Sequence, residues 1–102
     1  MDEHIINQVV LNIGKIPRGN HGELIKLNGK PFNTGSLAGF LARQSLQCKK
    51  LSYSQYKTGK AVADSVDTIN WLLRNGFMRE QPYPYRLILT DKFSELKVEA
   101  DD

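Results

Sequence analysis

The hydrophobic pattern is clearest between residues 61 and 75, where apolar side chains recur at helical spacing. The stripe consists of Val62, Val66, Ile69 and Leu73, with Leu72 beside it. Residues that are four, three and four positions apart lie on one face of a helix, and such a face needs a core to cover it. We expect Asp64 to cap the N-terminus of this helix, with Asp67 at the third position of a near capping box.

The end of this helix is marked by Asn75-Gly76. Glycine adopts the positive φ of a helix C-cap, and Phe77 stands where a Schellman motif folds an apolar side chain back onto the last turn. Two short extended runs follow over residues 77–81 and 85–90, joined by Pro82-Tyr83-Pro84. We therefore predict a β-hairpin directly after the helix.

The first segment, residues 1–16, fits both the apolar face of a helix and the alternation of a strand. We choose the helix, because Asp2 can serve as its N-cap and Gly14 with Pro17 as its stop.

Residues 23–34 predict a small hairpin, since Asn28-Gly29 is a strong two-residue turn signal. Pro31 has no N–H to donate, so the second arm is expected at a sheet edge. A helix from Leu37 to about Gln47 should then follow, with Ser36 as its N-cap.

Two shorter helices complete the predicted elements. One begins at Ser52 or Ser54 and runs through Lys60, so that residues 61–64 form a connection as tight as a helix-turn-helix requires. The other follows Thr90 as its cap. The whole chain, 1–102, is thus expected to be a single α+β, mostly helical domain, and its last residues, 97–102, an acidic tail.

Charge is unevenly distributed along the chain, although its net value is only +3. Residues 1–90 hold 12 Lys and Arg against 6 Asp and Glu, a balance of +6, while residues 91–102 hold five acids against two lysines. Within residues 43–60 there are five cations and no acid. A basic body attracts polyanions, nucleic acid first, and a solvated lysine-rich surface explains the charge alone equally well.

No residue pattern predicts an enzyme, because no nucleophile stands with a base and no carboxylates cluster. The single Cys48 has no partner for an intramolecular disulfide or a zinc site and is expected to be an inert thiol. Gly14 and Gly19 have phosphate-loop spacing, but Asn20 and His21 replace the lysine and the hydroxyl residue. We therefore expect no catalytic residue, metal, cofactor or small-molecule ligand.

The sequence lacks an apolar run of about 18 residues, the length of a membrane span, and it lacks a secretory signal at its start. We expect a cytoplasmic protein with no membrane partner.

Residues 36–96 resemble the winged helix-turn-helix domains of bacterial regulators of the multiple-antibiotic-resistance and arsenic type. Ile69 and residues 72–78 resemble the end of the recognition helix, and residues 85–92 resemble the returning wing strand with the start of the next helix. The resemblance implies a winged-helix DNA-binding protein, a transcription or replication regulator of prokaryotic or phage origin that binds double-stranded DNA, with a homodimer favoured. Residues 1–34 form an N-terminal helix and hairpin extension, assigned to dimerisation or to covering the core.

In such a complex, helix 64–75 would enter the major groove and the hairpin 77–90 would lie along the backbone as the wing. The residues expected to contact DNA are Lys57, Lys60, Ser65, Thr68, Asn70, Arg74, Arg79, Tyr83 and Arg86. Asp64 and Asp67 on the outer face would repel phosphate, although a carboxylate can accept a hydrogen bond from cytosine.

An adaptor that binds another protein and no longer reads DNA is the alternative. Its docking face would combine Trp71, Tyr83 and the two aspartates Asp64 and Asp67. Trp71 lies nearly opposite the predicted stripe, so it is either covered by the hairpin or the N-terminal segment, or exposed for a partner.

Overall fold

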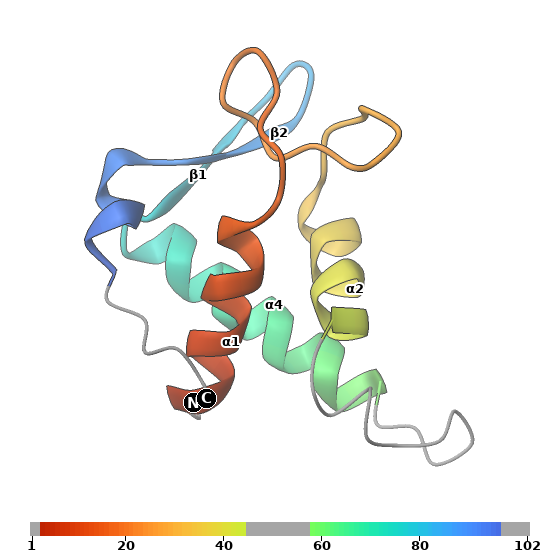
Figure 1. Cartoon of the computed structure of the whole chain (residues 1–102), viewed down its shortest axis with the longest axis vertical. Helices are drawn as coiled ribbons and strands as arrows, with labels where there is room; N and C mark the ends of the chain where they lie inside the picture. Colours follow the sequence, from red (N-terminus) through yellow and green to blue (C-terminus); the bar gives the residue numbers. More distant parts are fainter. Residues whose placement is uncertain (1–2, 45–57, 97–102) are drawn as a thin grey trace.

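Residues 3–44 and 58–96 are described by the computed structural model, in which helices pack against a two-stranded antiparallel sheet (Figure 1). The elements are α1 (Glu3–Gly14), α2 (Thr34–Gln44), α4 (Thr58–Arg74), β1 (Met78–Gln81), β2 (Arg86–Leu89) and the short 3-10 helix η2 (Asp91–Glu95). The described residues form a small compact α+β domain, which confirms the expected fold class at this level.

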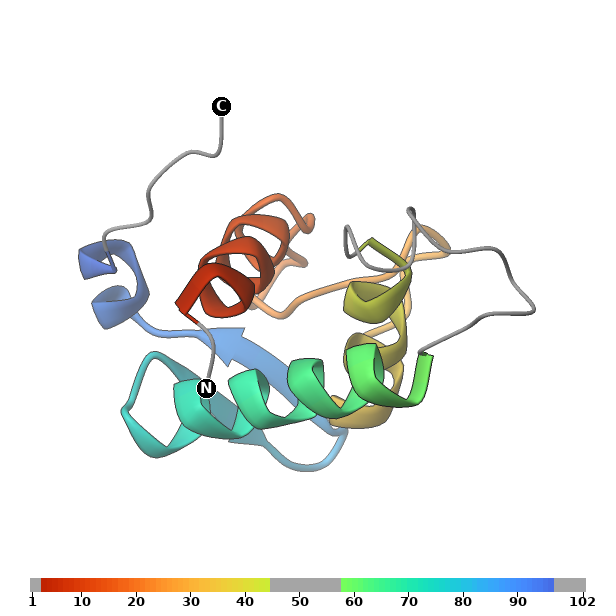
Figure 2. The ribbon, with the colours of Figure 1, turned by 90° about the horizontal axis from the view of Figure 1, so that it is seen from below.

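Helix α4 crosses beneath α1 and α2 and contacts both of them as well as β1 (Figure 2). Within the described residues, the buried core is built by α1, α2, α4, the segment at Leu24 and the sheet. Its fully buried large side chains include Ile13, Leu24, Leu37, Leu41, Ile69, Leu72, Met78 and Leu87. Ala38 and Ala42 of α2 are also buried, and their small side chains allow α4 to approach closely.

The choice of a helix for the first segment is confirmed by α1. Val9, Val10 and Ile13 are buried, and these positions share one helical face. The valines and isoleucines of this segment are accommodated in a helix because tertiary packing, more than propensity, stabilises most helices.

The hairpin predicted over residues 23–34 is only partly formed. Its two arms meet at a single bridge between Ile25 and Pro31, with no regular strand. The turn also differs, because only Gly29 has a positive φ (+84°) and its N–H donates to the Lys26 carbonyl at 2.9 Å. The loop therefore holds three residues and ends in a glycine bulge, a common alternative to the two-residue turn that Asn-Gly predicts.

The N-cap of α2 is Asn33, and the prediction of Ser36 is wrong. The Ser36 N–H donates to Asn33 Oδ1 at 2.7 Å, and the Asn33 N–H donates to Ser36 Oγ at 3.0 Å. This reciprocal pair satisfies two backbone donors at once, as a capping box does, so the helix begins at Thr34. The predicted residues 45–47 lie outside the described residues.

Helix α4 begins at Thr58, so the predicted break at residues 61–64 and the N-cap at Asp64 are wrong. Gly59 lies within the first turn of α4, where a single glycine is tolerated. Most of the short helix predicted before Lys60 lies outside the described residues.

The buried stripe of α4 is displaced by one residue from the predicted stripe. It consists of Ala61, Ser65, Thr68 and Leu72, with Ile69 beside it. Val66, which was expected in the core, is exposed. One residue corresponds to about 100° of rotation, and this rotation decides which side chains of α4 face solvent.

The predicted Schellman motif at the end of α4 is confirmed. Gly76 has a φ of +78°, and its N–H donates to the Leu73 carbonyl at 3.3 Å. The Phe77 N–H donates to the Leu72 carbonyl at 3.0 Å, which is the second bond of the motif. The rings of Phe77 and Trp71 stack with centroids 5.3 Å apart. Trp71 is therefore partly buried against the hairpin side of the helix end.

The hairpin after α4 is confirmed, with Met78 paired to Leu89 and Gln81 paired to Arg86. The final helix is a 3-10 helix, and Thr90 stands at its N-cap position without capping it through its side chain. The Thr90 hydroxyl donates instead to the Gly76 carbonyl. The Lys92 ammonium donates to the Asn75 carbonyl at 2.9 Å, a favourable position for a cation at a helix C-terminus.

A pair of glycine substitutions tests the C-cap of α4, with a glycine inside α2 as the contrast. Gly76→Ala should lower the free energy of unfolding by about 1 kcal/mol, because alanine at positive φ is strained. Gly39→Ala should raise it by about 0.5–1 kcal/mol, because residue 39 is inside α2 and its added Cβ meets no atom closer than 3.9 Å. Urea denaturation of the two variants measures both values, and equal effects would contradict the cap.

Candidate nucleic-acid interface

The solvent-exposed face of α4 carries one continuous row of side chains. Ala63, Asp67, Asn70 and Arg74 are exposed at spacings of four, three and four, opposite the buried stripe. Lys60 is exposed near the beginning of the same face. Asn70 and Arg74, two of the residues of this helix that were predicted to contact DNA, are accessible in this row.

Two other predicted DNA contacts are wrong, because the rotation of α4 buries them. Ser65 is 2% exposed and Thr68 is 0% exposed. The Thr68 hydroxyl donates to the Asp64 carbonyl at 2.8 Å, one turn earlier in the helix. A hydroxyl satisfied in this way can be buried without the cost of an unpaired polar group.

The exposed face of α4 is close to electrically neutral. The helix contains two cations and two acids, namely Lys60, Arg74, Asp64 and Asp67. Lys60 Nζ lies 3.4 Å from Asp64 Oδ2, so the first cation is already paired within the helix. Attraction of α4 to phosphate is therefore weaker than the basic composition of the whole chain suggests.

The hairpin carries an aromatic tip. Tyr83 is 95% exposed and has a φ of +57°, so its side chain projects from the turn between β1 and β2. On β1, Arg79 is exposed and its guanidinium donates to Gln81 Oε1 at 3.1 Å. Both residues are accessible to solvent, and their contact with DNA stays a prediction.

Arg86 does not have the freedom that a contact to the DNA backbone requires. Its Nη1 lies 4.0 Å from Glu23 Oε2, and the two side chains are only 16% and 10% exposed. Beside this pair, the Leu24 N–H donates to the Leu87 carbonyl at 2.9 Å. The segment before α2 is thus joined to β2 by backbone contacts, and Arg86 lies beside Glu23 without a hydrogen bond to its Oε2. Lys57 lies outside the described residues.

Tyr85 links the two strands of the hairpin next to the turn. Its hydroxyl donates to Glu80 Oε2 at 2.6 Å. Burial, followed by the hydrogen bond to Glu80 and the charge of that carboxylate, raises the pKa of Tyr85 to about 12. The protonated hydroxyl is thus the form that the folded hairpin favours.

A basic surface away from α4 was not predicted from the sequence. Lys15, Lys26 and Arg43 line one groove between α1, the loop after it and α2. A signal for it was present, because residues 24–63 contain seven Lys and Arg and no acid, whereas the prediction considered only residues 43–60.

The Glu23–Arg86 pair can be tested by single and double substitution. Arg86→Ala should lower the free energy of unfolding by about 2 kcal/mol, because it removes the positive charge beside a buried carboxylate whose Oε2 has no hydrogen bond to compensate for the loss. Arg79→Ala, on the exposed side of the hairpin, should change it by less than about 0.5 kcal/mol. The double variant Glu23→Gln/Arg86→Ala should recover part of the loss, and equal stability of the two single arginine variants would contradict the role assigned to Arg86.

The pKa of Tyr85 predicts a loss of stability at alkaline pH. The ordinary value is 10.0, so the unfolded chain loses this proton at a lower pH than the folded chain does. The contribution is fully present below pH 10 and is lost as the pH rises towards about 12. Urea denaturation from pH 9 to pH 12, a window set by those two values, should show a steeper decline for the natural chain than for Tyr85→Phe. Identical pH profiles would contradict this assignment.

Within residues 3–44 and 58–96, no three His, Cys, Asp or Glu side chains gather in a way that could hold a metal ion. None of the helices in that part of the chain is both long and apolar enough to cross a membrane. Comparisons of the chain with protein-family models, with curated proteins and with solved structures find no match.

Proposed function

We propose that this protein binds double-stranded DNA through a winged-helix arrangement, with α4 in the major groove and the β1–β2 hairpin as the wing. The order of elements supports this proposal. After α1, the segment at Glu23 and Leu24 bridges to β2, α2 and α4 follow, and the hairpin closes the domain. The observation that carries the proposal is the exposed row of α4, whose end passes through Gly76 directly into a hairpin with a projecting tip.

The base-reading side chains in this proposal are Asn70 and Arg74. Asparagine suits adenine and arginine suits guanine, because each offers a bidentate pair to the major-groove edge of that base. The two positions are one turn apart, about 6 Å along the helix axis, which is close to two base-pair steps of about 3.4 Å. Such a row reads a short block of sequence.

Contacts to the DNA backbone would come from the two sides of this row. Lys60 lies near the beginning of α4, and Arg79 lies on β1. Phosphate contacts of this kind fix the position of the helix without reading sequence. Tyr83 at the hairpin tip adds an aromatic contact to sugar or backbone.

Asp67 lies in the middle of the exposed row and weakens the attraction to phosphate. A single copy is therefore expected to bind modestly, and a homodimer on two half-sites would raise the affinity through linked binding. A small cytoplasmic transcription or replication regulator of prokaryotic or phage origin fits these properties best.

A protein-binding adaptor is the second candidate, favoured by the neutral outer face of α4. Its proposed anchor is weaker than the sequence suggested, because Trp71 stacks on Phe77 and is partly buried. Tyr83 and Asp67 remain exposed for this role.

The DNA proposal is tested by selecting bound duplexes from a random pool and measuring affinity by fluorescence anisotropy. Arg74→Ala should weaken binding to the selected sequence by about tenfold or more, and random duplex much less, because a bidentate base contact contributes about 1–3 kcal/mol of discrimination. Arg79→Ala should weaken both duplexes alike and lower the salt slope by about one.

Lys30→Ala, an exposed cation on the loop before α2, serves as the matched control and should change neither measurement appreciably. The absence of binding to any duplex at about 50 mM salt, where phosphate contacts are strong, would reject the DNA proposal.

A further inference from the structure

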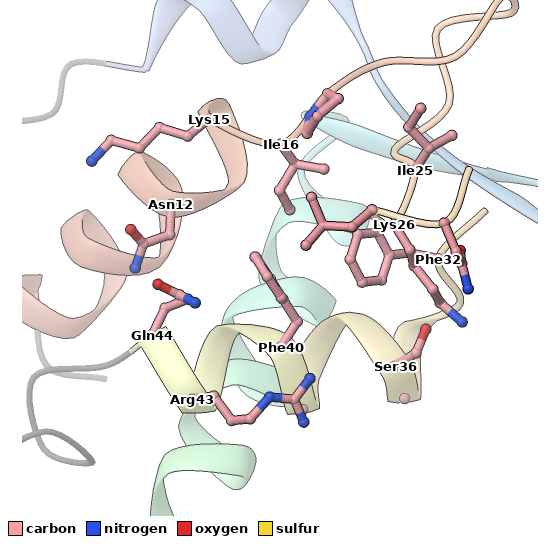
Figure 3. A pocket seen from close by; sticks show the side chains of 15 residues that line it. Asn12, Lys15, Ile16, Ile25, Lys26, Phe32, Ser36, Phe40, Arg43 and Gln44 are labelled. Atoms are coloured by element: carbon pink, nitrogen blue, oxygen red, sulfur yellow. The ribbon is translucent and has the colours of Figure 1, made fainter. Parts of the chain in front are cut away.

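A groove opens between the end of α1, the loop that follows it and the outer face of α2 (Figure 3). Its volume is about 990 Å³. Along α2 the lining runs from Gly35 to Gln44, nine steps or about 13 Å of helix. The groove is therefore more than two helical turns long.

The floor of the groove is apolar and firmly held. Partly exposed Ile25 and Phe40 give it accessible apolar surface. Ile16 and Phe32 are buried behind this surface, and the Phe32 ring lies 5.4 Å from that of Phe40 at a tilted angle. Gly35 and Gly39 contribute no side chains, so the backbone of α2 can be approached closely. A partner that enters the groove would cover apolar surface without a rearrangement of the core.

The rim of the groove is basic. Lys15, Lys26 and Arg43 come from three different segments and stand at separate points around it (Figure 3). Among the described residues that line the groove there is no Asp or Glu. At its edge, Leu27 is 99% exposed, a large apolar side chain in water beside an apolar floor. This combination is typical of a surface that another molecule covers.

We propose that this groove docks an acidic amphipathic helix of a partner protein. An apolar stripe on that helix would fill the floor with anchors at the i, i+3, i+4 and i+7 positions, and flanking carboxylates would meet the three cations. The separation of the cations favours several acids on one segment over the single carboxylate of a small molecule. The groove is independent of the exposed row of α4, so the proposal does not depend on DNA binding.

The apolar floor argues against nucleic acid as the occupant. Bases bind such surfaces by stacking on exposed aromatic faces. The Phe32 ring is buried, with Lys26 Nζ 6.0 Å from its centroid, and Phe40 is packed against the core and only partly exposed, so neither ring presents an open face. A sugar-phosphate backbone could pair with the cations of the rim, but it would not cover the apolar floor with apolar groups.

The experiment is a selection from a displayed library of amphipathic helices of about 18 residues, long enough to fold when bound, whose polar faces vary freely between acidic and basic residues. Selected peptides are synthesised and their affinity is measured by fluorescence anisotropy. We expect enrichment of peptides with Glu and Asp beside an apolar stripe, and loss of binding when their acids are replaced by Lys.

Substitutions locate the binding. Lys26→Glu and Arg43→Glu should each weaken the selected acidic peptide by about tenfold, since each turns an attraction at the rim into a repulsion. Lys30→Glu is the matched control, because Lys30 lies in the same loop outside the groove lining, and it should weaken the peptide less than about twofold. Gly39→Gln should block binding by filling the groove, and thermal unfolding of every variant verifies that it is folded.

Four results would overturn the proposal. The selection can yield no acidic amphipathic peptide, or yield peptides whose affinity is the same for Arg43→Glu and the natural chain. Alternatively, Lys26→Glu and Arg43→Glu can weaken a single-stranded or duplex oligonucleotide while no peptide binds, which would assign the groove to nucleic acid. A groove filled by a second copy would appear as self-association that Gly39→Gln abolishes, and it would also reject the partner helix.

Discussion

The left-handed backbone at Gly76 is the constraint on which the second half of the structure depends. Its φ of +78° turns the chain out of α4 and brings Phe77 back onto Trp71. The carbonyls left free at this helix end then accept from Thr90 and Lys92, which follow the hairpin. One turn of backbone thus joins the end of α4 to both ends of the hairpin, so the direction of the hairpin relative to α4 is set there. Any function that uses α4 and the hairpin together relies on this junction.

The sequence was sufficient to predict this junction because its signals are local. A glycine after a polar residue, with an apolar residue next, specifies both the positive φ and the contact that stabilises it. The face of α4 was not predictable in the same way. Valines at 62 and 66 mark the wrong stripe, because the true one contains Ser65 and Thr68, whose polarity argues for exposure. Thr68 is buried because its hydroxyl donates to a carbonyl of its own helix, and the apolar pattern contains no trace of that bond.

Long-range pairs were beyond the sequence for a related reason. Arg86 was expected to contact the DNA backbone from the hairpin, yet it lies beside Glu23 from the other half of the chain. The residues next to Glu23 and Arg86 in the sequence contain no pattern from which this contact could be predicted. The basic groove combines α1, a loop and α2 in the same manner, and only the absence of acids over residues 24–63 hinted at it.

Most of the positive charge of the chain lies outside α4, the helix proposed to read DNA sequence. Residues 1–90 carry a balance of +6, yet α4 itself contains equal numbers of cations and acids. Much of the positive potential must therefore arise from elements other than the exposed row of α4. Under the proposed function, that potential would draw the protein towards DNA in a salt-dependent way. The neutral row would contribute little to this general attraction, so stable binding would depend on base contacts from Asn70 and Arg74. Asp67 would then disfavour duplexes that offer no compensating base edge, because its carboxylate would lie close to phosphate in such a complex.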